Sequence, residues 1–189
     1  MSIPIVSRKE YRCPEGTEKE NTMALRNIVK QGDPILTKVC RPVKEVNDHT
    51  RMILDDMVET MEHAMGVGLA APQVGILRRM FVVEIPEFDE EGNLVNSTLY
   101  ELINPEIVEQ KGEQYEEEAC LSVPGLCGNV KRPMYVKIKG LDRNGNEVVY
   151  EGEGLTAKAF CHEYDHLDGI LYVDKADDIH ETDAYGSDE

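Results

Sequence analysis

The chain has 189 residues, a length that fits one domain, with or without tails, and that can bury a substantial core. Its formal net charge of −17 excludes proteins that hold nucleic acid through clustered Lys and Arg side chains. No signal peptide or membrane-spanning run is evident, and five cysteines are too few for a secreted disulfide scaffold, so we expect a cytoplasmic globular protein.

The N-terminal part contains little periodic pattern. Residues 1–22 are polar and aperiodic, which predicts a flexible extension, and the apolar pattern begins just after them, so that we interpret Met23 as the native start. The stretch 39–46 predicts a loop or a short strand, because Pro42 breaks any helix there.

A helix is predicted from Asp48 to Met65, with Asp48 as its N-cap and Gly66 as the residue that follows its end. Apolar residues recur there at helical spacing, on one face that we expect to lie in the core. They are Ile53, Leu54, Met57, Val58, Met61 and Met65.

Strands are predicted after this helix. The apolar run Arg79 to Ile85 ends at Pro86 and predicts a buried strand. Three further strands are expected at 101–108, 134–143 and 147–154. Asn144-Gly145 lies between the last two and is a hairpin signal.

Helical spacing returns from Gly154 to Leu167, and we expect the acidic residues 175–189 to form a frayed tail. The order of one helix, several strands and one helix predicts an α+β fold, with antiparallel or mixed strands around a central helix and one further amphipathic helix near the N-terminus.

The stretch FCHEYDHLDG in the last predicted helix contains the pattern HExxH. His162 and His166 are separated by about 40° around a helix axis, so both imidazoles can reach one metal ion. Glu163 is about 100° from His162 and can flank a metal-bound water, whereas Cys161 lies on the opposite flank. The five-residue pattern HExxH also occurs by chance on surface helices, so it does not by itself establish a metal site.

A catalytic site needs a third protein ligand. Protease patterns place it downstream, but position 172 is Tyr172, and Glu181 and Glu189 belong to the predicted tail. Upstream, Cys120 lies in an apolar setting, and a thiolate with two imidazoles suits Zn²⁺ or Fe²⁺. Another metal hydrolase and a closed structural site completed by Cys127 remain alternatives, the second ranked last.

Three segments together resemble peptide deformylase. They are GVGLAAPQVG (Gly66 to Gly75), EACLS (Glu118 to Ser122) and HEYDHLDG (His162 to Gly169), in the order typical of that family. The resemblance extends from about Leu25 to Asp174. It implies removal of the N-formyl group from the initiator methionine of nascent peptides, with release of formate.

The resemblance also implies roles for individual residues. The metal ligands would be Cys120, His162 and His166, and Glu163 would be the general base and then the proton donor. Gln73 and the N–H of Leu121 would polarise the formyl oxygen. The segment Gly66, Val67 and Gly68 would bind the substrate. A hydroxide on the metal would attack the formyl carbon while Glu163 transfers the proton.

One divalent ion is implied, with Fe²⁺ as the physiological metal, although Zn²⁺, Ni²⁺ and Co²⁺ accept the same ligands. The implied partners are N-formylmethionyl nascent chains near the ribosome, and we expect no direct binding to nucleic acid or to a membrane.

Two positions depart from the family pattern. Ala119 stands where the family usually has Gly, and Cys161 stands where it often has Gln. Glu118 and Arg132 would either form a partly buried ion pair or remain two solvated charges. Asp165 would either hydrogen-bond to a ligating His or be a solvated residue on the helix surface.

Overall fold

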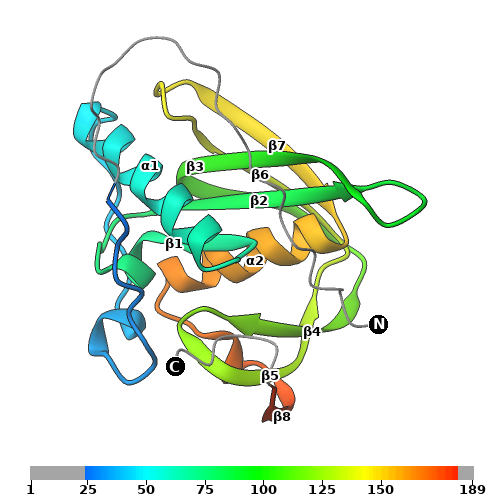
Figure 1. The fold of residues 1–189 in the computed structure, drawn as a ribbon. Coiled ribbons are helices and arrows are strands. Elements are labelled where there is room, and N and C mark those ends of the chain that lie inside the picture. Colours follow the sequence, from blue (N-terminus) through cyan, green and yellow to red (C-terminus); the bar gives the residue numbers. More distant parts are fainter. Residues whose placement is uncertain (1–23, 183–189) are drawn as a thin grey trace.

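The structure is a computed structural model that describes residues 24–182 (Figure 1). The predicted extension 1–22 lies outside the described residues, as does the end of the acidic tail. The described helices are α1 (Asp48–His63) and α2 (Leu155–Leu167), with short 3-10 helices η1 (Pro34–Thr37), η2 (Ala71–Val74) and η3 (Tyr172–Asp174).

The strands form two antiparallel sheets. The first has the order β1-β2-β3-β6-β7, with β1 at Gly68–Ala70, β2 at Met80–Phe88, β3 at Leu94–Lys111, β6 at Tyr135–Leu141 and β7 at Glu147–Glu153. The second has the order β4-β5-β8, with β4 at Gln114–Cys120, β5 at Val123–Arg132 and β8 at Asp177–Glu181. Helix α2 lies between the two sheets (Figure 1), which confirms the α+β fold around a central helix.

Helix α1 forms where predicted, but its ends differ. Its N-cap is Asn47 rather than Asp48, because the Asn47 side chain accepts a hydrogen bond of 3.1 Å from the Thr50 N–H. After the helix, Met65 and not Gly66 takes the left-handed conformation, with φ of 55°. The prediction that Met65 belongs to the buried face is wrong, since it is 84% exposed.

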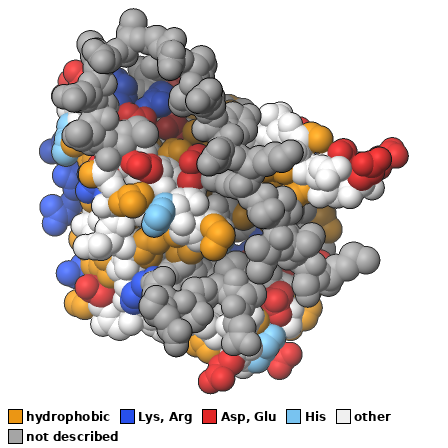
Figure 2. Space-filling model, in the orientation of Figure 1, with side chains coloured by type: hydrophobic (Ala, Val, Ile, Leu, Met, Phe, Trp, Pro, Cys, Tyr) orange, Lys and Arg blue, Asp and Glu red, His pale blue; other side chains and the backbone are white. Residues whose placement is uncertain are grey.

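Strand β2 continues through Pro86, which was predicted to end it. Pro86 pairs with Ser97 of β3, while β1 covers the other edge of β2 only at residues 81–83. Pro86 therefore lies where one edge of β2 has no neighbour in the sheet, and its missing N–H removes no ladder hydrogen bond. The acidic turn between β2 and β3 projects from the molecule (Figure 2).

The hairpin of β6 and β7 is confirmed, with Gly145 at φ of 82° in its turn. The prediction of a frayed end is wrong for Asp177–Glu181, because these residues form β8 and pair with β5. The pairing rests on main-chain hydrogen bonds that acidic side chains do not prevent.

Helix α2 is buried on two sides. One side packs with Phe81 and Val83 of the five-stranded sheet, through residues that include Phe160 and Leu167. Its other side carries the histidines and contacts β4, where Glu118 lies within hydrogen-bond distance of His162. Neither of the two helices in the described region is long and apolar enough to cross a membrane.

Candidate active site

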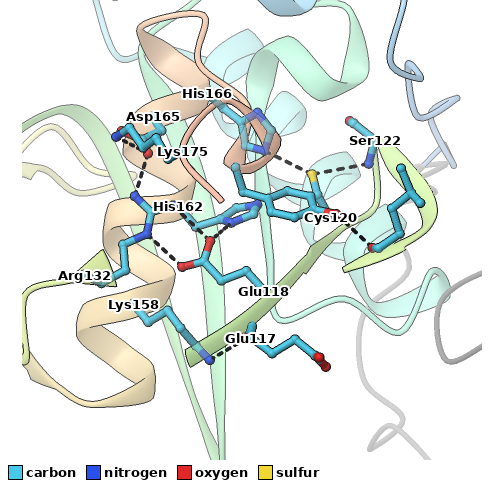
Figure 3. Close-up of polar contacts among 12 residues, drawn as sticks. Glu117, Glu118, Cys120, Ser122, Arg132, Lys158, His162, Asp165, His166 and Lys175 are labelled. Carbon is cyan, nitrogen blue, oxygen red and sulfur yellow. Dashed lines mark hydrogen bonds and ion pairs between the residues drawn. The ribbon is translucent and has the colours of Figure 1, made fainter. Parts of the chain in front are cut away.

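Helix α2 and the end of β4 bring together Cys120, His162 and His166 (Figure 3). One potential ligand atom from each lies within 4.8 Å of the other two, and Cys120 Sγ is 3.3 Å from His166 Nε2. Cys161 instead packs into the core on the far side of α2. The register of β4 with β5 shifts between Ala119 and Cys120, and the three side chains meet with Ala119 in place.

The orientation of His162 fits a metal ligand. Its Nδ1 lies 2.8 Å from Glu118 Oε2, and because a carboxylate only accepts, Nδ1 carries a hydrogen and Nε2 is the ring nitrogen left for a metal. Burial lowers the pKa of His162, but hydrogen bonds with Cys120 and Glu118 raise it well above its usual value, so this ring gives up a proton when a metal binds. Burial and the neighbouring His162 lower the pKa of His166, which favours a neutral imidazole there. A thiol and two imidazoles form a donor set for a borderline divalent cation.

Glu118 belongs to a buried charge network that holds His162 in place (Figure 3). Arg132 donates to both Glu118 oxygens, at 2.7 and 2.9 Å, and to Asp165 Oδ2 at 2.6 Å. Burial alone would raise the pKa of Glu118, but hydrogen bonds from Arg132 and His162 lower it to about 2. The buried pair of Glu118 and Arg132 is confirmed; the Arg132 side chain is only 4% exposed.

Asp165 has a different partner from the one expected. It contacts Arg132 and the ammonium of Lys175, which lies 2.7 Å from both its oxygens, and not a ligating histidine. Lys175 was not identified from the sequence, because it belongs to the segment interpreted as tail. Its membership of the charge network is evident only from its contact with Asp165, which lies 10 residues earlier in the chain.

Glu163 is buried beside the cluster, and its Oε2 has no hydrogen-bond partner among the described residues. Burial raises the pKa of its carboxyl to about 7. Gly68 lies against it: a Cβ added there would be 2.8 Å from Glu163 Cδ. A carboxyl group with an unpaired oxygen and a pKa near neutrality can both accept and donate a proton.

Gln73 is held with its amide nitrogen toward Cys120. Its Oε1 accepts a hydrogen bond of 2.8 Å from the Ala70 N–H, and its Nε2 lies 3.4 Å from Cys120 Sγ and 3.2 Å from Ser122 Oγ. Ser122 belongs to a segment noted in the sequence, but no role was predicted for it. Here it fixes the Gln73 amide.

The N-terminal strap, residues 24–31, supports both of these residues through main-chain bonds. The Val29 N–H donates to the Gln73 carbonyl and the Gln31 N–H to the Ser122 carbonyl, each at 2.7 Å. Contacts made by the main chain leave no signal in side-chain types, so the sequence could not reveal this strap.

The segment Gly66 to Gly68 and the turn at Leu121 border the cluster. A Cβ at Gly66 would meet Leu121 Cδ1 at 2.7 Å, so these two segments are in contact. Val67 is 36% exposed, and its carbonyl accepts from the Glu84 N–H. Thus all nine predicted site residues lie in one region, with an exposed rim beside a buried cluster.

Comparisons with known proteins agree with this arrangement. The family model described as polypeptide deformylase matches residues 25–182. A peptide deformylase of Caldanaerobacter subterraneus subsp. tengcongensis is 54% identical over 153 residues, which cover 81% of this chain and 90% of that protein.

Two solved structures are similar along most of their length. A peptide deformylase from Thermotoga maritima is 38% identical with a TM-score of 0.73, over 82% of this chain and 99% of that one. A class I type b peptide deformylase from Acinetobacter baumannii, described as bound to Met-Ala-Ser, is 34% identical with a TM-score of 0.73, over 81% and 99% of the two chains.

Proposed function

The chain belongs to the polypeptide deformylase family, and from this membership we propose which of its residues carry out the reaction. Members of this family are metal-dependent hydrolases. The enzyme removes the N-formyl group from nascent peptides and releases formate. We place it in the cytoplasm, near the ribosome, where such chains emerge.

We propose that Cys120, His162 and His166 hold one divalent cation, Fe²⁺ under physiological conditions. Support comes from their mutual distances and from the Glu118 hydrogen bond, which occupies His162 Nδ1 and leaves Nε2 as the nitrogen that would bind the ion. When bound, such a cation acts as a Lewis acid and lowers the pKa of water. Three protein ligands are the number typical of catalytic sites, which keep a position open.

Glu163 would transfer the proton of the reaction. It would take a proton from the attacking water and deliver it to the nitrogen of methionine as the bond to the formyl carbon breaks. A carboxyl pKa near 7 suits both directions of transfer at neutral pH, because neither the acid nor the base is too weak.

The tetrahedral oxyanion needs donors that are already in place. Gln73 would supply its Nε2–H, which the Ala70 and Ser122 contacts orient, and Leu121 its main-chain N–H. The partly exposed segment Gly66, Val67 and Gly68 would lie along the peptide backbone. The tripeptide Met-Ala-Ser named for the Acinetobacter baumannii relative has the composition of such a product.

The observation that carries the proposal is Glu163 with an unpaired oxygen beside a Cys120–His162–His166 cluster. The test is formate release from formyl-Met-Ala-Ser by anaerobically purified protein. We expect turnover with this peptide and none at internal peptide bonds of an N-terminally blocked peptide. Metal-loaded protein that releases no formate, or that cleaves internal bonds instead, would contradict the proposal.

A further inference from the structure

A second group of metal-binding side chains lies on the three-stranded sheet. Glu117 of β4, Cys127 of β5 and His180 of β8 each offer one ligand atom, and these atoms lie within 4.8 Å of one another. Cys127 is the register partner of His180. The Cys127 Sγ to His180 Nε2 distance is 3.1 Å, and His180 Nε2 is 3.3 Å from Glu117 Oε2.

This group is separate from the catalytic cluster. Side chains alternate between the faces of a strand, so that Glu117 points away from the face on which Glu118 contacts His162. Figure 3 shows the two glutamates leaving β4 in different directions. Cys127 pairs with Ala119, and therefore lies on the Glu117 face.

The ring of His180 is oriented as metal-binding histidines usually are. Its Nδ1 lies 2.8 Å from the carbonyl oxygen of Asp178. A carbonyl only accepts, so Nδ1 carries a hydrogen and the other nitrogen, Nε2, is directed to Cys127 and Glu117. An outer carbonyl that fixes the ring in this way is the arrangement found behind ligating imidazoles.

The spacing agrees with one tetrahedral ion. Bonds of about 2.3 Å to sulfur and 2.0 Å to nitrogen or oxygen place a sulfur and a nitrogen ligand about 3.5 Å apart, and two N or O ligands about 3.3 Å apart. The observed distances of 3.1 and 3.3 Å are close to these values. A thiolate and an imidazole select borderline ions such as Zn²⁺ or Co²⁺ over Mg²⁺ and Ca²⁺.

We propose that Glu117, Cys127 and His180 form a second metal site that binds a zinc-class divalent cation. Cys127 forms its buried floor, and the exposed Glu117 and His180 give the ion access from solvent. The ion would connect the three strands β4, β5 and β8. It would hold the edge strand β8 in place relative to β4, the strand that carries Cys120.

The test uses Zn²⁺ alone on the full chain with Cys120→Ala, which removes a ligand of the first cluster. After loading and desalting, we expect about one retained equivalent of Zn²⁺ and a higher thermal midpoint than in the chelated protein. Adding His180→Ala or Cys127→Ser should remove both effects. His63→Ala, an exposed histidine on α1, is the matched control and should change neither.

His180 is exposed, so its replacement tests the site even where Cys127→Ser impairs folding. Retention of Zn²⁺ that is the same with and without His180 would overturn the proposal, as would the absence of any retained Zn²⁺ in the Cys120→Ala protein. In the otherwise unchanged chain, His180→Ala should leave formate release intact, which separates this site from the catalytic one.

Discussion

Gly68 lies so close to Glu163 that a single methyl group on residue 68 would come within 2.8 Å of the carboxyl carbon. Glu163 is buried on a helix that packs on both sides, so it has little room to withdraw. The position of the proposed proton carrier therefore depends on a glycine from a distant segment.

Gly68→Ala should lower kcat for formate release by at least about tenfold, because Glu163 would be displaced from its place beside the cluster. Gly66→Ala is a matched control. It adds the same methyl group in the same segment, but against the end of the flexible Leu121 side chain. We expect a smaller loss there. Equal kcat values for both variants and the wild type would contradict this role of Gly68.

Replacement of Cys120 tests the thiol of the first cluster. Cys120→Ala should reduce formate release by about 10² or more, since the cation would lose one of three ligands. Cys161→Ala removes another buried thiol on the far side of α2, and should keep activity at some cost in stability. Similar activity losses in both variants, measured alongside thermal midpoints, would argue against Cys120 as a ligand.

Several features of the fold could be predicted from the sequence because they depend on local patterns. The helical spacing that ends at Leu167 and the Asn144-Gly145 turn are examples, and each appears where expected. By contrast, the course of β2 through Pro86 depends on which of its edges has a neighbour. No window of sequence around Pro86 contains that information.

Long-range contacts explain what was missed at the site. The residue types of HExxH and Cys120 indicated the cluster, but the contact of Lys175 with Asp165 exists only once the chain turns back after α2 through η3. The main-chain bonds from Val29 and Gln31 use no particular side chain. Such contacts are visible only in three dimensions.

Shortening the chain tests the N-terminal strap. A chain that begins at Met23 keeps residues 24–31, and we predict full activity and an unchanged thermal midpoint. A chain that begins at Gly32 loses the Val29 and Gln31 bonds to Gln73 and Ser122. We expect kcat to fall by about tenfold or more as Gln73 loses its support. Full activity of the shorter chain would refute the role of the strap.

Acid stability should depend on Glu118. Its pKa is about 2 in the folded protein and near 4.5 in the unfolded chain, so the unfolded chain binds protons first as the pH falls. The stabilisation is therefore complete above pH 4.5 and is lost as the pH falls toward 2. Glu118→Gln should destabilise the protein by about 3–5 kcal/mol at neutral pH, because Arg132 stays buried without its full partner.

The measurement is the difference in free energy of unfolding between wild type and Glu118→Gln, in chelator-treated protein, from pH 7 to pH 3. Removing the cation first matters, because its own release in acid would add to the pH dependence. Glu151→Gln, in an exposed pair with Lys137, is the control and should have little effect. A difference that stays constant down to pH 3 would show that Glu118 is not the titrating group.

Glu163→Gln separates proton transfer from metal binding. Gln keeps the volume and the hydrogen-bonding reach of Glu163 but has no basic carboxylate, and Glu163 is not among the three clustered ligand residues. The fold and the metal content should survive, while formate release should fall by about 10²–10⁴, the usual contribution of general acid–base catalysis.

Three measurements on the wild type and Glu163→Gln are needed together: metal content, formate release and cleavage of a blocked peptide. If Glu163 only filled space next to Gly68, the Gln variant would do the same and retain its activity. If the enzyme were a peptidase, the wild type would cut the blocked peptide. A Gln variant that holds its metal and still releases formate at the wild-type rate would rule out Glu163 as the proton carrier.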